Sequence, residues 1–230
     1  MVVCIKNITL TQCYVSMTKG KTLKQALTEY LPFGCADTVT EWFDTNHVIL
    51  RITRSRRSKL GDCRIGNPAA PPIISINYNL NPFAFLVTLL HEMAHAEVFM
   101  TRKRRVKPHG DEWKMAYQKL GTPFLKPGFL PETLRQAFGN YLKNPQASST
   151  ANLPLAEALR EFDPPKDFTL ISDLHEDAVF SLPDGRVFRR GVKLRKRYRC
   201  VCLSNKRIYL FSPLAEIIPV ESDAKLNRAV

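Results

Sequence analysis

Two histidines and a glutamate in one short stretch could hold a metal ion and activate a water molecule. His91, Glu92 and His95 form the pattern His-Glu-x-x-His. On a helix, residues four apart lie on the same face, so both imidazoles can reach one ion, and the glutamate beside the first can reach a water bound to it. The chain has only 5 histidines, which makes chance a poor explanation. The pattern predicts a metal site with its own general base.

A zinc site needs a further ligand from elsewhere in the chain. The metzincin pattern, with a glycine and a histidine at fixed positions just after His95, is absent. His109 lies where a loop turns into a second expected helix ending near Leu120, and neutral imidazole is a favoured zinc ligand. It is the preferred third ligand. Glu112 is the alternative, as is a His109 that binds nothing.

The helix that must carry the pattern has a clear beginning. Asn81 is a good N-cap residue, and Pro82 fits the first helical position. The stretch from Phe83 to Met100 contains no Gly or Pro and is apolar enough that a membrane span has to be weighed. Its glutamates and histidines would be costly inside a bilayer. We therefore expect a buried core helix and no membrane span.

These motifs and their flanks resemble a known family. The segments are LLHEMAHAEVF, KPHGDEWKMAYQKLG, KTLKQALTEYLP, ITRSRRSKLGDCR, ISINYNLNPFAFLVTLLHE, PFLKPGFLP and GVKLRKRYRCVC. They are similar to the SprT-like zinc metalloproteases, a family that includes bacterial SprT proteins and the Spartan protease, over roughly residues 21–220. The resemblance implies one Zn²⁺ on His91, His95 and His109, with Glu92 as catalytic base. It also implies a zincin-like α+β fold, with helices packed on a small antiparallel sheet.

The expected organisation has four parts: an N-terminal extension at 1–20, a SprT-like domain at 21–143, a linker at 144–167 and a basic, β-hairpin-rich C-terminal domain at 168–230. Within the SprT-like domain, apolar periodicity predicts helices at 21–31 and 36–46, strands at 47–54, 60–64 and 73–78, and a loop at 124–131. In the last part, Pro183–Gly185 and Ser204–Lys206 read as hairpin turns.

The C-terminal part departs from the family pattern in its cysteines. Many SprT proteins finish in a zinc ribbon built from paired Cys-x-x-Cys motifs. Here only Cys200 and Cys202 are present, and two thiols cannot supply four ligands. We expect a ribbon-like β element without its metal, and hence a single zinc ion in the chain.

Basic residues point to an anionic partner. The chain has 34 Lys and Arg against 21 Asp and Glu, a net charge of +13. Besides a run at 51–59, the candidate nucleic-acid-binding residues are Arg102, Lys103, Arg104, Arg105, Arg189, Arg190, Lys193, Arg195, Lys196, Arg197 and Arg199. Such runs bind phosphate backbones without reading sequence, and Phe188 and Tyr198 could stack on unpaired bases. A solvated basic face, or one that binds acidic proteins, is the competing interpretation.

Together these features predict a zinc-dependent metallopeptidase acting on DNA-associated or DNA-crosslinked proteins. The alternatives are a general or regulatory metalloprotease with acidic protein partners, and a non-catalytic nucleic-acid-binding protein with a structural zinc. The six cysteines follow no secreted framework, and the first 19 residues contain no continuous apolar stretch. We therefore expect a cytoplasmic location with reduced thiols. The sequence indicates neither the oligomeric state nor the group that would stabilise an oxyanion.

Overall fold

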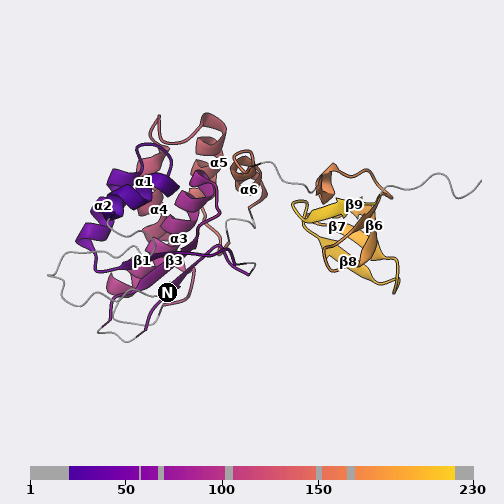
Figure 1. Ribbon diagram of the computed structural model, residues 1–230, viewed down its shortest axis with the longest axis horizontal. Coiled ribbons are helices and arrows are strands. Elements are labelled where there is room, and N and C mark those ends of the chain that lie inside the picture. Colours follow the sequence, from indigo (N-terminus) through magenta and orange to yellow (C-terminus); the bar gives the residue numbers. More distant parts are fainter. Residues whose placement is uncertain are drawn as a thin grey trace, which may run out of the picture. The chain divides into compact units, whose positions relative to one another are not determined.

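The chain divides into two compact units, residues 1–164 and 165–230. The computed structural model describes residues 21–56, 58–66, 70–101, 106–148, 152–164 and 169–220 (Figure 1). Each unit has its own hydrophobic core. Both contain regular secondary structure, and the fold class is α+β.

The first unit is mainly helical. Its elements are α1 (Leu23–Tyr30), α2 (Ala36–Thr45), β1 (Ile49–Thr53), β2 (Gly61–Arg64), β3 (Ile73–Asn77), α3 (Pro82–Thr101), α4 (Asp111–Gly121), the 3₁₀ helix η1 (Thr122–Leu125), α5 (Glu132–Leu142) and α6 (Leu153–Arg160). The helices and strands predicted upstream of residue 121 are all present within a few residues of their expected ends. Helix α5 was not predicted.

The sheet of this unit is mixed, so the prediction of an antiparallel sheet is wrong. The strand order is β1-β3-β2, with β1 parallel and β2 antiparallel to β3. The link between β1 and β2 does not form a hairpin but crosses to the far side of β3. Arg56 in that link donates to the side chain of Asn77 at 2.8 Å and to the carbonyl of Ser75 at 3.2 Å. The crossing leaves β2 as a short edge strand.

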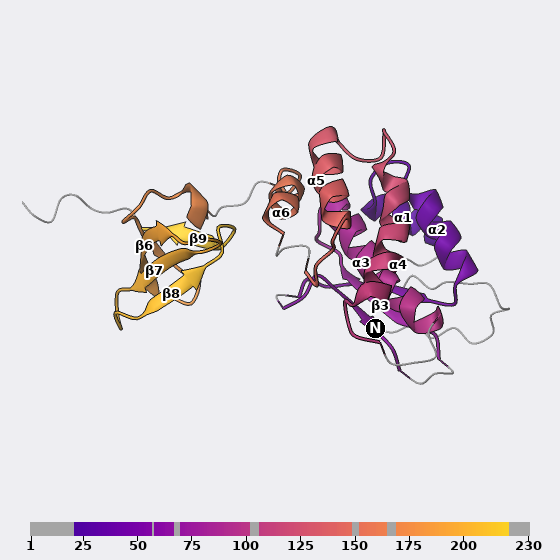
Figure 2. The same cartoon turned by 180° about the vertical axis from the view of Figure 1, so that it is seen from behind.

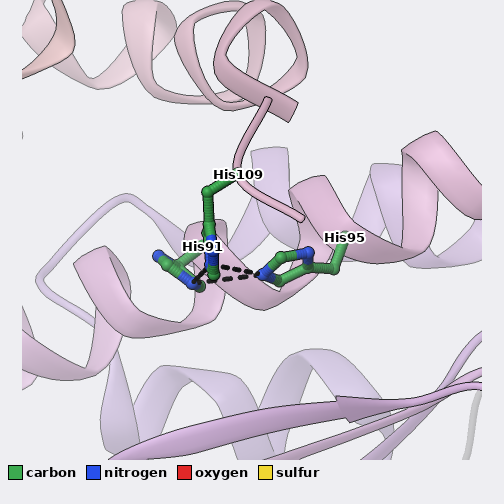
Figure 3. Close-up of side chains that lie close together, drawn as sticks. All are labelled: His91, His95 and His109. Carbon is green, nitrogen blue, oxygen red and sulfur yellow. Dashed lines mark hydrogen bonds between the residues drawn. The ribbon is translucent and has the colours of Figure 1, made fainter. Parts of the chain in front are cut away.

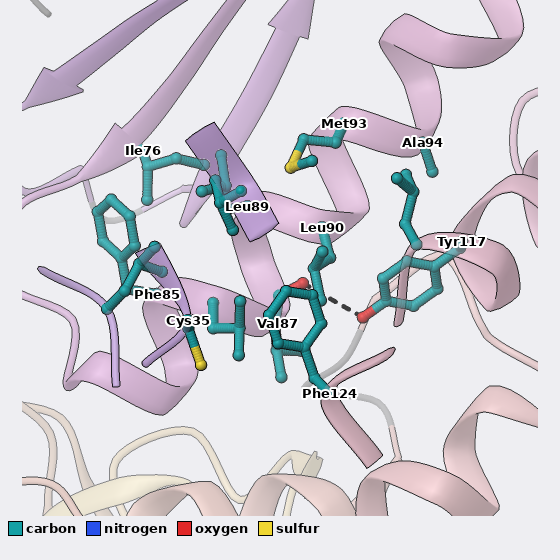
Figure 4. Packing of buried hydrophobic residues seen from close by; sticks show 14 of the residues in the cluster. Cys35, Ile76, Phe85, Val87, Leu89, Leu90, Met93, Ala94, Tyr117 and Phe124 are labelled. Carbon is teal, nitrogen blue, oxygen red and sulfur yellow. Dashed lines mark hydrogen bonds between the residues drawn. The ribbon is translucent and has the colours of Figure 1, made fainter. Parts of the chain in front are cut away.

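Helix α3 lies at the centre of the first core. It packs against β2 and β3 on one side and runs beside α4, as both views show (Figures 1 and 2). Phe85, Leu89 and Met93 are buried near Ile76, and the Tyr117 hydroxyl donates to the Val87 carbonyl at 3.2 Å (Figure 4). By length and composition α3 could cross a membrane. Its burial among these residues agrees with the expected core helix.

The segment expected as a linker contains helix α6, which belongs to the first core. Leu155 and Leu159 are buried there. The side chain of Asn81, at the start of α3, donates to the Leu159 carbonyl at 2.9 Å and to the Asp163 carboxylate at 2.7 Å. The first unit therefore continues to residue 164.

The second unit is an antiparallel sheet. Its elements are β4 (Thr169–Leu170), the 3₁₀ helix η3 (Ile171–Asp173), β5 (Val179–Ser181), β6 (Val187–Lys193), β7 (Tyr198–Cys202), β8 (Ile208–Phe211) and β9 (Glu216–Pro219), in the order β4-β9-β5-β6-β7-β8. Both predicted hairpins are present, between β5 and β6 and between β7 and β8. The small core is formed by Ile171, Phe180, Phe188, Tyr198, Cys200, Cys202 and Ile217.

Candidate metal centre

Helix α3 carries the His-Glu-x-x-His pattern at its middle. The helix begins as the sequence predicts, because the Asn81 side chain accepts a hydrogen bond from the backbone N–H of Ala84 at 2.9 Å. Glu92 is buried, whereas His91 and His95 are half-buried. The two histidines therefore reach from the core helix toward the side on which α4 packs.

His109 meets them from the loop before α4. Its φ of +56° lies in the left-handed region, where histidine is more common than most side chains. The turn is closed by a hydrogen bond from the N–H of Gly110 to the carbonyl of Lys107 at 2.9 Å. This reversal brings the His109 ring over α3 (Figure 3). His109, and not Glu112, joins the group of potential ligands.

The three Nε2 atoms converge on one point. They are 3.1 Å apart for His91 and His109, 3.3 Å for His91 and His95, and 3.0 Å for His95 and His109 (Figure 3). The Nε2 of a neutral imidazole either donates or accepts a hydrogen bond, so at least one of these three contacts pairs two donors or two acceptors. In a tetrahedral site with Zn–N bonds of about 2.0–2.1 Å, ligand nitrogens lie about 3.3 Å apart. The histidine set fits a zinc ion.

Trp113 holds the cluster together. Its ring centroid lies 4.7 Å from those of His91 and His109, and its Nε1 donates to the His91 carbonyl at 3.3 Å. Tyr117 stacks behind Trp113 with centroids 5.2 Å apart. Both aromatic side chains are buried. They fix α4 against α3, and so fix the position of His109.

The electrostatics keep the histidines neutral. Burial, and then the neighbouring His95 and His109, lower the pKa of His91 to about 3. Burial, followed by the charge of His109, lowers the pKa of His95 to about 4. The pKa of His109 is also lowered by burial. Because metal ligation requires unprotonated imidazole, the cluster is ready for an ion at neutral pH.

Glu92 follows His91 on α3 and lies against the edge strand β2. Its side chain is only 7% exposed. Burial and then the negative charge of Asp62 raise its pKa to about 7, against a hydrogen bond from the Cys63 backbone N–H and the charge of Arg56, which lower it. A carboxyl group with a pKa near neutrality can both accept and return a proton.

Gly61 allows this close approach of β2 to α3. A Cβ atom at Gly61 would lie 2.8 Å from Thr88 Cγ2, 2.9 Å from Ile76 Cδ1 and 3.0 Å from Glu92 Cγ. Any larger residue would have to displace the helix side chains, Glu92 among them. Sequence reasoning did not single out Gly61, although a glycine inside a strand often marks such a contact.

An ion-pair network on β2 was also missed. The Asp62 carboxylate pairs with Arg56, with Lys59 at 3.2 Å and with Arg64 at 2.9 Å, and these partners keep its pKa low. Asn77 donates to the carbonyls of Arg56 at 3.2 Å and Lys59 at 2.9 Å. Part of the first basic run therefore neutralises Asp62 and fixes the link to β2.

The candidate nucleic-acid-binding residues separate into two groups. Arg102, Lys103, Arg104 and Arg105 lie outside the described residues. Arg189, Lys193, Arg195, Lys196, Arg197 and Arg199 are exposed on β6, β7 and the turn between them, and Arg190 is half-buried. The prediction that Phe188 and Tyr198 stack on bases is wrong. Phe188 is 0% and Tyr198 5% exposed, because alternate residues of β6 and β7 face the core.

Cys200 and Cys202 share the inner face of β7, as their spacing predicts, and both are buried. Cys202 contacts the Ser204 hydroxyl at 3.2 Å. Within the part of the chain that the structure describes, the three histidines are the only group of three or more residues found in a metal-binding arrangement.

Comparison with known proteins agrees with the geometry. Residues 35–135 match the model of the SprT-like family. That range contains β1 to β3, α3, α4 and all three histidines, and it ends before the second unit. No curated protein and no solved structure matched the chain. The first unit thus contains a SprT-like domain.

Proposed function

We propose that the protein is a zinc-dependent metallopeptidase. The observation that carries this proposal is the convergence of His91, His95 and His109 on one point, with the buried Glu92 on the same helix. A zinc ion that serves only the fold is closed by four protein ligands, whereas catalytic sites keep three and an open position. Three imidazoles beside a raised-pKa carboxyl group match the catalytic kind.

The residues divide the chemistry between them. The histidines hold the ion, and Trp113 and Tyr117 keep the ring of His109 in place. A bound zinc ion polarises the scissile carbonyl and lowers the pKa of water. Glu92 accepts the proton of the attacking water and returns it to the leaving amine, for which a pKa near 7 is well suited.

The edge strand β2 offers a place for an extended peptide. In an antiparallel ladder, hydrogen-bonded pairs alternate with non-hydrogen-bonded pairs. The Asn77 N–H donates to the Leu60 carbonyl, so the next hydrogen-bonded pair is Asp62 with Ser75. Gly61 and Cys63 then have their backbone groups directed to the open edge, where the Cys63 N–H already meets Glu92. A substrate strand paired with this edge would pass beside Glu92.

The proposed substrates are proteins attached to or lying on DNA. Support comes from the exposed cations of β6 and β7, which suit a phosphate backbone. The same charges would suit acidic protein substrates, so a general metalloprotease is the second candidate. Binding and cleavage assays separate the two, because only the first requires DNA.

The test is to incubate zinc-loaded protein with purified DNA-binding proteins, with and without DNA. We expect fragments that are more abundant with DNA and that disappear in the variant Glu92→Gln, while zinc content stays at that of the wild type. Glutamine keeps the shape of the side chain but cannot accept the proton. Fragments that persist in the variant would show that Glu92 is not the base. Equal cleavage with and without DNA would favour the general protease.

A further inference from the structure

Strand β6 contains a bulge that places two cations on one face. Arg190 pairs with Cys200, but Lys193 pairs with Tyr198, so β6 has one extra residue opposite Arg199. Residues three apart on a regular strand point to opposite faces, and one extra residue brings them to the same face. Gly191 makes the bulge, since a Cβ there would lie 2.5 Å from the Arg199 carbonyl oxygen.

Both cations lie over the same aromatic ring. The Arg190 guanidinium carbon is 4.2 Å and the Lys193 ammonium 5.7 Å from the centroid of Tyr198. The ring is only 5% exposed, because it closes one end of the small core. Tyr198 is therefore a platform that holds two positive charges by its π face, and it is not available to a base.

The pair has no anionic partner among the residues that the structure describes. By contrast, Arg186 on the same strand region pairs with Asp184 at 2.8 Å. Arg190 Nε is buried without a hydrogen-bond acceptor. Two like charges beside one ring repel each other, and an anion between them would relieve that repulsion.

The other face of the same strands provides a contrast. Arg189 pairs with Val201, and Arg199 with Leu210, so these two arginines point away from the core among aliphatic side chains. Leu210 is 51% exposed. Each of the two pairs thus carries two positive charges, but only Arg190 and Lys193 gather theirs over one ring.

We propose that Arg190 and Lys193, set over Tyr198 by the bulge at Gly191, form a binding site for a phosphodiester group of a nucleic-acid backbone. Guanidinium supplies a fork of donors to phosphate oxygens, and lysine adds a mobile charge. Since Phe188 and Tyr198 are buried, this contact positions the strand without stacking on its bases. The inference rests on the DNA association in the proposed function and specifies the residues responsible.

The experiment measures binding of the full-length protein to a fluorescent DNA duplex at several salt concentrations. The variant Arg190→Gln/Lys193→Gln is compared with Arg189→Gln/Arg199→Gln, which removes the same charge from the opposite face. Each lost duplex phosphate contact lowers the slope of log K against log salt by about 0.9. Because both cations of the first variant share one phosphate, we expect a decrease of about 0.9, and a much smaller change in the second variant.

An equal or larger loss in Arg189→Gln/Arg199→Gln would overturn the assignment to the Tyr198 face. A melting curve accompanies each variant, and the single change Lys193→Gln, at an exposed position, repeats the test if the double variant does not fold. Binding to phosphatidylserine vesicles in preference to DNA, lost in the same variant, would overturn the assignment to nucleic acid. A wild-type protein that does not bind DNA would refute the DNA association itself, while zinc-dependent cleavage could still stand.

Discussion

The histidine cluster of the first unit and the cation pair of the second both gather like groups, but by different means. His91, His95 and His109 are held by packing, which lowers the pKa of each imidazole and leaves three lone pairs facing one point. Arg190 and Lys193 are held at the surface by a bulge and one aromatic ring. Burial keeps the three histidines neutral, so that they can bind a metal ion. At the surface, Arg190 and Lys193 provide positive charges that can attract an anion.

The largest difference between the two regions should be in metal binding. We expect His95→Ala to lower zinc affinity by more than about 100-fold. Loss of a residue that only hydrogen-bonds to a ligand costs up to about 100-fold, and loss of a ligand should cost more. Cys200→Ala/Cys202→Ala should leave zinc content unchanged, because two thiols on one strand cannot complete a site. Zinc titration against a chelator measures both. Loss of zinc in the cysteine variant would show that the second unit also holds metal.

Acidification of the metal-free protein should weaken the first unit. The folded pKa values of His91 and His95, about 3 and 4, lie below 6.5, so the unfolded chain binds more protons as pH falls below 6.5. Each histidine then removes up to about 1.4 kcal/mol of stability per pH unit. Glu92 acts in the opposite direction between pH 4.5 and about 7, because its folded pKa is raised. The net loss is about 1.4 kcal/mol per unit between pH 6.5 and 4.5.

Urea unfolding in the presence of a chelator, repeated at several pH values, measures this change in the free energy of unfolding per pH unit. The variant His91→Gln/His95→Gln should reverse this dependence of stability on pH. Stability should then fall as pH rises from 4.5 to about 7, because Glu92 keeps its raised pKa and only His109 opposes it. An unchanged slope in the double variant would contradict the electrostatic account of the cluster.

Close packing beside Glu92 gives a third prediction. Gly61→Ala should destabilise the first unit by about 1–3 kcal/mol, the usual cost of overpacking, and should lower kcat by displacing Glu92. Gly66→Ala is the matched control, since a Cβ there meets nothing within 4 Å. Thermal unfolding and peptidase assays measure both variants. Equal behaviour of the two alanines would mean that the approach of β2 to α3 does not position Glu92.

The smallest effect is expected from the exposed arginines of the second unit. Arg189→Gln/Arg199→Gln should leave Tm unchanged within error, because solvated charges contribute little to stability. Calorimetry of the full-length protein measures this. A clear decrease in Tm would show that these arginines support the fold and are not free for a partner.

The sequence predicted the elements that carry the chemistry, because their signals are local. Asn81-Pro82 marks the start of α3, and the four-residue spacing of His91 and His95 requires a helix. The turn residues of Pro183–Gly185 and Ser204–Lys206 mark the two hairpins. His109 was preferred over Glu112 from ligand chemistry, and the structure places it in the cluster.

Features that depend on distant parts of the chain were not predicted. The parallel pairing of β1 with β3 depends on a link held by Asn77, and the role of Gly61 depends on a helix that follows it by more than twenty residues. Helix α5 lacks a side-chain cap, although Leu134, Phe138, Tyr141 and Leu142 have helical spacing that could have revealed it. Phe188 and Tyr198 were misjudged because a basic run does not reveal which face of a strand is buried.

The most direct test of the account is a crystal structure of zinc-soaked protein with anomalous diffraction recorded on both sides of the zinc absorption edge. We predict one strong anomalous peak within bonding distance of the Nε2 atoms of His91, His95 and His109. A peak elsewhere, or none at this site with zinc in excess, would contradict the claim that these three histidines form the metal centre.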